Sequence, residues 1–221
     1  MAEWWTPVGL SLRVSVLSTL LVIITGTWAA FRMKKKAWKK RSWVEPFFML
    51  PMVLPPTVLG FGLVYLFGRN GPLGQMLGLV DMHIYFSLSG AVLASAVVSF
   101  PLMYQSAKAA FQKVEDGYIH AARTLGTSEK KIFFSVILPL AWPGLAAGGL
   151  LSFARGIGEF GATLMIAGYI PGKTDTLPIA IYFAVETGEW AKAFGWTSLL
   201  LILGVTVIYT LNRITPGEGE R

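Results

Sequence analysis

Five long apolar stretches determine what this chain can fold into. They cover residues 9–31, 47–68, 86–107, 132–154 and 195–212. A helix rises about 1.5 Å per residue, so roughly 20 residues cross the ~30 Å hydrocarbon core of a bilayer. The last stretch is short, but a helix there can extend by a turn toward Trp190. Because the alternating pattern of membrane β-strands is absent, we expect an all-α integral membrane protein with five transmembrane helices.

The composition excludes several classes of protein. Hydrophobic residues make up 54% of the 221 residues and charged residues only 14%, whereas a soluble domain carries about 25% charged residues. A soluble enzyme and a disordered chain are therefore both excluded. The absence of cysteine excludes disulfides, thiolate zinc sites and iron–sulfur clusters. We expect residues 1–221 to form a single transmembrane domain.

The distribution of basic residues predicts how the spans are oriented. Residues 32–41 hold seven lysines and arginines, residues 108–131 hold five, and Arg213 and Arg221 follow the last span. The other side of the membrane receives four. Because basic residues concentrate in cytoplasmic loops, we expect the N-terminus outside and the C-terminus in the cytoplasm. The basic runs then face anionic lipid rather than nucleic acid.

Residues 158–190 contain two apolar pieces, 160–170 and 177–185, each too short to span a bilayer. A polar turn containing Lys173 and Asp175 separates them. We expect a re-entrant or interfacial hairpin on the outer face, since irregular backbone at membrane depth must be buried in protein or line a cavity. The alternative is a sixth span over 162–185, which would place both charges in the middle of the membrane.

Catalytic constellations are scarce. The two histidines, His83 and His120, fall on opposite sides of the membrane in the predicted topology. No zinc-protease, nucleophile-elbow or EF-hand motif occurs. Residues 167–174 match a relaxed phosphate-loop pattern but lack the required strand and helix around it. We therefore expect no catalytic residue, no metal site and no cofactor in this chain.

The loop between the third and fourth spans is more informative. Val114, Tyr118 and Leu125 recur at helical spacing and predict a short amphipathic helix. Gly126 can adopt the left-handed conformation that ends such a helix, and Thr127 or Ser128 can begin the next one. The loop can be an ordinary surface connection or a rigid knob that projects into the cytoplasm; both interpretations fit the pattern.

The same loop resembles the EAA loop of ABC importer permeases. Residues 120–126 read HAARTLG and residues 136–139 read VILP, which is the spacing of that family's Glu-Ala-Ala, Gly and Ile-x-Leu-Pro positions. His120 stands where the family has Glu, and Val136 where it has Ile. The residues that the resemblance assigns to the coupling loop, within about 108–131 and just after it, are His120, Ala121, Ala122, Gly126, Leu138 and Pro139.

Residues 152–182 closely resemble molybdate-transport permeases, through an Arg-x-x-Gly-Glu-Phe-Gly element at 155–161 that sulfate permeases share in part. The resemblance implies the fold of type I ABC importer permeases. It also implies a membrane homodimer in a bacterial or archaeal cytoplasmic membrane, two ATP-binding cassette subunits that use the ATP, and an extracytoplasmic molybdate-binding protein. This chain would then be a transport subunit and not an enzyme.

A tetrahedral dianion needs polar groups along its path, because bare charge in hydrocarbon is costly. Ser95 and Ser99 share one helix face, and Thr163 follows Glu159 closely. The serines can line a pathway, or they can be small residues that let helices pack. Arg155 and Glu159 lie four residues apart and can form a structural ion pair, or Arg155 can attract the oxyanion while Glu159 holds it in place.

Three alternatives remain at the level of function. Tungstate or sulfate can replace molybdate as the cargo without any change in the rest of the interpretation. A membrane-embedded enzyme would need carboxylates, histidine or serine gathered at one depth, which the spans lack. A passive channel would not need the loop that resembles an ATPase-coupling element.

Overall fold

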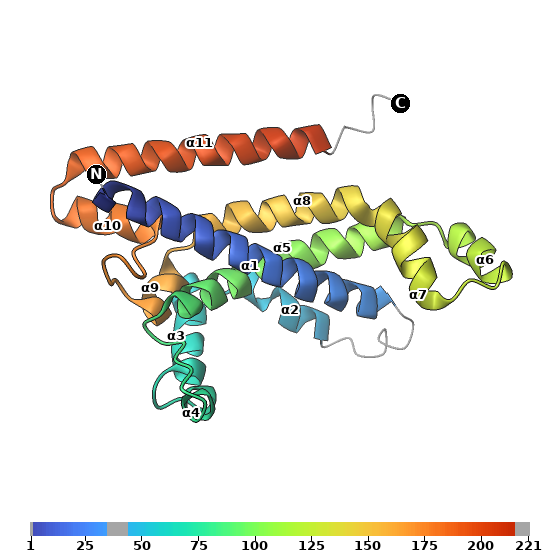
Figure 1. The fold of residues 1–221 in the computed structure, drawn as a ribbon, viewed down its shortest axis with the longest axis horizontal. Coiled ribbons are helices and arrows are strands. Elements are labelled where there is room, and N and C mark those ends of the chain that lie inside the picture. The colour runs from blue at the N-terminus through green and yellow to red at the C-terminus, as the bar shows by residue number, and fades with distance from the viewer. Residues whose placement is uncertain (1, 35–43, 215–221) are drawn as a thin grey trace.

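The computed structural model describes residues 2–34 and 44–214, and every regular element within those ranges is a helix. Three long helices lie side by side at the centre of the molecule (Figure 1): α1 (Ala2–Lys34), α5 (Leu88–Lys113) and α8 (Leu138–Ile157). The last helix, α11 (Trp190–Ile214), packs more loosely against α8 and the short helix α10 (Leu177–Glu186). The all-α membrane fold predicted from the sequence is therefore confirmed.

Small residues bring the three central helices together. A Cβ atom added at Gly148 of α8 would lie 2.6 Å from the Cβ of Ser106 on α5, and one added at Gly144 would lie 2.6 Å from the Cβ of Ala110. On α1, a Cβ at Gly26 would lie 3.0 Å from the Cγ of Met103. Close backbone approach at such positions is how helices associate in lipid, where no water is available to drive them together.

Four predicted spans match long apolar helices. Residues 9–31 lie in α1, most of 86–107 lies in α5, and 195–212 lies in α11, which extends back to Trp190 as expected. Residues 132–154 lie in a continuous span, Glu129–Ile157, made of α7 (Glu129–Ile132), a π-helical turn (Phe133–Ile137) and α8. Because Pro139 has no N–H to donate, a locally wider turn before it replaces the regular ladder.

The second predicted span differs from the expectation of one helix over residues 47–68. It forms two helices, α2 (Val44–Val53) and α3 (Pro56–Phe67), whose axes are bent by 117°. The break falls at Leu54 and Pro55. Two consecutive prolines remove two backbone donors and restrict the residue before them to extended conformations, which ends the first helix. In Figure 1, α3 and the following α4 (Pro72–Gly78) point away from the central helices.

Residues 158–190 form two short helices, α9 (Gly161–Ala167) and α10, joined by a nine-residue connection, 168–176, and not one helix over 162–185. The connection is held internally. The Thr174 hydroxyl donates to the Gly168 carbonyl oxygen and accepts from the Ile170 N–H, both at 3.0 Å. The Leu177 N–H donates to the Ser11 hydroxyl on α1 at 2.6 Å. This hairpin is therefore fastened to the first half of α1.

The molecule has two distinct ends (Figure 1). The short helix α6 (Asp116–Thr124) and α7 project at one end, and the N-terminus, α9 and α10 lie at the other. Arg32, Lys113 and Lys130 belong to the α6 end. Most of the predicted basic run at 32–41, and Arg221 in the tail, lie outside the described residues.

Candidate functional site

Helix α6 is a short amphipathic helix on a stalk formed by the ends of α5 and α8. Its inner face buries Ile119 among Val114 and Ile132, which belong to the large central core. Its outer face exposes Tyr118 and ends at Leu125, whose side chain is 84% exposed. Tyr118 and Leu125 thus leave apolar surface uncovered at the tip of this projection.

Gly126 ends α6 in a well-defined cap. Its φ is +72°, in the left-handed region that glycine adopts without strain. The Thr127 N–H donates to the Ala122 carbonyl oxygen at 3.1 Å, and the Gly126 N–H donates to that of Arg123 at 2.9 Å. These two bonds define a Schellman motif, so the chain reverses direction at a fixed angle.

An ion pair joins α6 to α7 across this turn. Arg123 Nε lies 2.7 Å from Glu129 Oε1, and Arg123 Nη2 lies 3.2 Å from Glu129 Oε2. This bidentate geometry fixes the relative direction of two planar groups. The hydrogen bond and the charge of Glu129 raise the pKa of the Arg123 guanidinium. Ser128 precedes α7 as expected, although its side chain makes no capping hydrogen bond.

The structure gathers the residues of the predicted coupling loop at this end of the molecule. His120 and Ala121 are exposed on α6, and Ala122 is half-buried against the central core. Leu138 and Pro139 follow the π-helical turn at the start of α8. The loop is thus a short projection in which the spacing of the motif corresponds to one helix, one cap and one turn of the next span.

Arg155 and Glu159 form a direct ion pair at the other end of α8. Arg155 Nη1 lies 2.9 Å from Glu159 Oε2, and Glu159 Oε1 accepts a hydrogen bond from the Ala162 N–H at 2.9 Å. Glu159 is only 3% exposed, whereas the Arg155 side chain is 36% exposed. The buried carboxylate therefore holds both the start of α9 and an arginine that still reaches the surface.

Ser95 and Ser99 lie fully buried between α1, α5 and α8. The hydroxyls of Ser95 and Ser18 lie 2.9 Å apart, and Ser99 donates to the Ser95 carbonyl oxygen at 2.7 Å. Ser152 on α8 donates to the Ser99 carbonyl oxygen at 3.4 Å. The Ser18–Ser95 and Ser152–Ser99 bonds tie α5 to α1 and to α8, whereas the Ser99–Ser95 bond lies within α5. Sequence reasoning missed Ser18 and Ser152, and the signal for the former was the row of serines at 11, 15 and 18 on one face of α1.

Thr163 lies in α9, 1% exposed, and its hydroxyl has no hydrogen-bond partner among the described residues. Within residues 2–34 and 44–214, no three His, Cys, Asp or Glu side chains gather in a way that could hold a metal ion.

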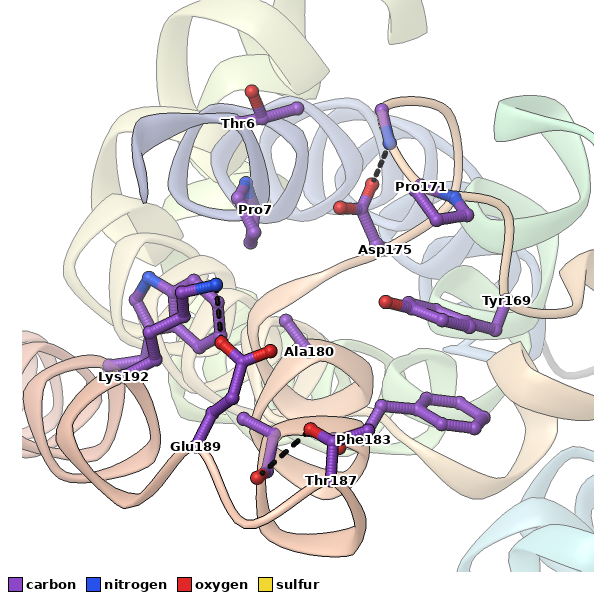
Figure 2. Close-up of a pocket in the computed structure, with 13 residues that line it drawn as sticks. Thr6, Pro7, Tyr169, Pro171, Asp175, Ala180, Phe183, Thr187, Glu189 and Lys192 are labelled. Atoms are coloured by element: carbon purple, nitrogen blue, oxygen red, sulfur yellow. Dashed lines mark hydrogen bonds and ion pairs between the residues drawn. The ribbon is translucent and has the colours of Figure 1, made fainter. Parts of the chain in front are cut away.

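A cavity of about 450 Å³ lies at the end opposite α6, between the start of α1, the hairpin and α11 (Figure 2). Its polar lining includes Asp175, Glu189 and Lys192, and its apolar lining includes Phe183 and Trp196. Sequence reasoning missed this pocket. The only local signal was the polar run Thr-Asp-Thr at 174–176 between two apolar pieces, because the other walls come from residues far away in the chain.

Comparison with known proteins identifies the family. The sequence profile of the family described as "Binding-protein-dependent transport system inner membrane component" matches residues 22–215. This range includes α6, its glycine cap and the whole of α8.

Several curated proteins are similar over most of their length. YvgM of Bacillus subtilis, whose name refers to a molybdenum transport system permease, is 42% identical over 213 residues, which cover 96% of this chain and 94% of that protein. The molybdenum transport system permease protein ModB of Escherichia coli is 40% identical over 184 residues, covering 83% and 80%. The sulfate transport system permease protein CysT of Salmonella typhimurium is 32% identical over 181 residues, covering 82% and 65%.

Solved structures share the fold. The structure titled as an amino acid ABC transporter with histidines matches with a TM-score of 0.67 at 15% identity, covering 96% of this chain and 92% of that one. The inward-facing methionine ABC transporter MetNI matches with a TM-score of 0.68 at 17% identity, covering 96% and 93%. At these identities the likeness concerns the fold alone.

The profile match and the identity to full-length relatives agree with the helical fold. Proteins of this kind are multi-pass transport subunits of the cytoplasmic membrane rather than enzymes, and they work with ATPase subunits and binding proteins. The chain belongs to the family of binding-protein-dependent transport system inner membrane components, the permease subunits of ABC importers.

Proposed function

We propose that this permease translocates molybdate, which an external molybdate-binding protein delivers and which two copies of the chain carry across the membrane. The observation that carries the proposal is the α6 element with its Gly126 cap, in a chain that is 42% and 40% identical to two permeases named for molybdenum transport. Tungstate has the same shape and charge as molybdate. Sulfate is the second candidate, because the CysT relative is named for it.

Helix α6 is the contact with the ATPase in this proposal. Tyr118 and Leu125 are exposed apolar side chains at the tip of the molecule, and Ala121 allows close approach of a partner surface. The Schellman cap and the Arg123–Glu129 ion pair make the projection rigid. A rigid projection transmits a displacement of the ATPase to α5 and α8, which enter the membrane directly from it.

The N-terminus lies outside and α6 lies in the cytoplasm in this proposal. Lys108, Lys113, Arg123, Lys130 and Lys131 lie on or beside the α6 projection, on the side that the positive-inside rule assigns to the cytoplasm, whereas Arg69, Arg155, Lys173 and Lys192 lie in other elements. The hairpin that contains α9 and α10 then faces the outside, where a binding protein docks.

Arg155 is the residue of the candidate pathway that meets the oxyanion. It is the half-exposed member of its ion pair, and the buried Glu159 positions it without covering it. Partial neutralisation by Glu159 keeps the site from trapping a dianion. Ser95 and Ser99 use their hydroxyls within the bundle and serve helix packing, and Thr163 remains a buried hydroxyl near Glu159.

Competition of uptake tests the cargo. Cells that lack their own molybdate permease would express this chain with its ATPase and binding protein and would receive radiolabelled molybdate. We expect ATP-dependent uptake that equimolar tungstate reduces by about half and that a large excess of sulfate leaves unchanged. Sulfate competing as well as tungstate would make the protein a general oxyanion permease, and no uptake would refute the proposal.

A further inference from the structure

The cavity between α1, the hairpin and α11 has a buried carboxylate in its lining. Asp175 lines it and is only 7% exposed. Its Oδ1 accepts a hydrogen bond from the Gly172 N–H at 2.8 Å, which fixes the carboxylate, and the other oxygen points into the cavity (Figure 2). The hydroxyl of Tyr169 points into the same space.

Aromatic side chains form much of the remaining wall. Tyr169 and Phe183 stack with ring centroids 4.0 Å apart and planes inclined by 16°. Trp196 packs against Trp4 at 5.5 Å, and its Nε1 donates to the Trp4 carbonyl oxygen at 3.1 Å. The first contact joins the 168–176 connection to α10 and the second joins α11 to α1, so both parts of the aromatic wall are packed in place.

The charges of the lining select the sign of the ligand. Asp175 and Glu189 contribute two carboxylates and Lys192 contributes one ammonium, which pairs with Glu189. The lining therefore carries a net negative charge and repels the transported oxyanion. A carboxylate held in an aromatic-walled pocket is suited to a cation, because the rings also attract positive charge.

The shape of the pocket selects among cations. Lysine and arginine side chains have long apolar stems that cover aromatic surface while the charged group reaches a carboxylate at the end. A cavity of about 450 Å³ is large enough for such a side chain. The pocket lies at the end of the molecule opposite the α6 projection (Figure 1).

We propose that this pocket receives one lysine or arginine side chain of the external binding protein and that Asp175 pairs with its charged group. The inference rests on the proposed function, because that function places α10 and the hairpin on the outer face. The hairpin connects α9 to α10 and is bonded to Ser11 of α1. A cation in the pocket therefore lies between α1, the hairpin and α11, so docking of the binding protein can affect the packing of these elements.

The test measures binding of the cognate binding protein to the complete transporter in nanodiscs. Asp175→Asn retains an acceptor for the Gly172 N–H and removes only the charge. Removing one partner of a desolvated charge pair weakens a complex by a factor of ten or more, so we expect the dissociation constant to rise at least about tenfold. Asp81→Asn makes the same change at an exposed aspartate of the α4–α5 connection and should bind like the wild type.

A second variant keeps the test informative if Asp175→Asn assembles poorly. Thr187 lines the rim of the pocket and is exposed. Thr187→Lys adds an ammonium to the lining and removes its net negative charge, so it should also weaken binding of a cationic side chain. Wild-type affinity in both variants would overturn the pocket proposal while leaving the proposed function intact.

Two further outcomes separate the alternatives. If the wild-type transporter neither binds the cognate protein nor hydrolyses ATP faster in its presence, the proposed function itself fails. If the effect of Asp175→Asn disappears in nanodiscs of phosphatidylglycerol alone, a cationic lipid headgroup occupies the pocket, and the pocket proposal is wrong. An effect that persists in those nanodiscs supports the binding-protein side chain.

Discussion

At the scale of single residues, the buried Glu159 carboxylate links α8 to the start of α9. Both of its oxygens are used, one by Arg155 and one by the Ala162 N–H, and the side chain is buried. Replacing one member of a buried pair leaves the other polar groups unsatisfied, which costs about 3–5 kcal/mol. The lower end of that range applies here, because Arg155 can still reach solvent.

We therefore predict that Glu159→Ala lowers the free energy of unfolding by about 3 kcal/mol. Thermal unfolding of the purified protein in detergent measures this loss as a lower midpoint. Glu186→Ala, at an exposed glutamate near the end of α10, should leave the midpoint unchanged. Equal midpoints for the two variants would show that the ion pair and the cap of α9 do not stabilise the fold.

The buried Asp175 makes the folded protein less stable as pH rises, whereas a carboxylate paired with a cation makes it more stable. Burial raises the pKa of Asp175, and the hydrogen bonds from its own N–H and from that of Gly172 offset this only in part. The folded protein then binds this proton more tightly than the unfolded chain, so stability falls as pH rises from the ordinary aspartate pKa to the raised one.

The comparison of Asp175→Asn with the wild type isolates this contribution. We expect the variant to gain stability relative to the wild type as pH rises through that interval, and the difference to stay constant above it. Unfolding midpoints across a pH series check the sign. A variant that loses relative stability over the same interval would show that the ionised carboxylate stabilises the hairpin.

At the scale of elements, the cap at Gly126 depends on backbone conformation alone. No atom lies within 4 Å of a Cβ added there, so a side chain meets no clash, but φ is +72°. For a residue other than glycine, this left-handed backbone conformation costs about 1–2 kcal/mol, and the cost is smallest for asparagine.

We predict that Gly126→Val lowers the amount of molybdate transported per ATP hydrolysed by several-fold, because the angle between α6 and α7 changes. Gly126→Asn should retain most of the coupling. Transport and hydrolysis measured in the same proteoliposomes give the ratio. An unchanged ratio in the valine variant would remove the rigid-projection mechanism.

The contact between α5 and α8 allows a matched test of helix packing. A Cβ at Gly148 would lie 2.6 Å from the Cβ of Ser106, whereas a Cβ at Gly204 of α11 would meet nothing within 4 Å. Overpacking of this kind costs about 1–3 kcal/mol. We predict that Gly148→Ala lowers the thermal unfolding midpoint and that Gly204→Ala leaves it unchanged. Gly148→Ala combined with Ser106→Gly should recover part of the loss, because the second change removes the contact with the Ser106 Cβ but adds a glycine to the interior of α5.

The elements show which parts of the fold the sequence could predict. The long apolar helices α1, α5, α8 and α11 follow from length and hydropathy, because a spanning helix satisfies its own backbone. The bend between α2 and α3 was missed, although Pro55 and Pro56 are visible in the sequence. The mean hydropathy of an apolar run is nearly the same whether or not prolines divide it. The direction of α3 also depends on its packing against α9.

At the scale of the whole molecule, a site formed by one continuous segment can be predicted from the sequence, whereas a site formed by distant segments cannot. The proposed coupling loop is one short segment with a fixed spacing, so the sequence alone could propose its residues. The pocket combines residues near positions 6, 175 and 189, which only the packing of α1 with the hairpin and α11 brings together. The serines of α5 were visible, but only the structure places Ser18 and Ser152 against them.

The orientation of the molecule can be measured cleanly because the chain contains no cysteine. Ser128 in the α6–α7 turn and Lys173 in the hairpin are both exposed. We predict that a membrane-impermeant maleimide added to intact cells labels Lys173→Cys and not Ser128→Cys, and that permeabilised cells label both. The reverse pattern in intact cells would place the α6 element outside and exclude its contact with an ATPase.

The central claim, that this permease imports molybdate when coupled to an ATPase, has one direct test. Proteoliposomes would contain the permease and its ATPase, with ATP inside, and would receive molybdate-loaded binding protein outside. The account predicts that labelled molybdate accumulates above its external concentration only when ATP, the ATPase and the binding protein are all present. Equilibration without ATP would indicate a passive channel, and no accumulation with every component present would contradict the account.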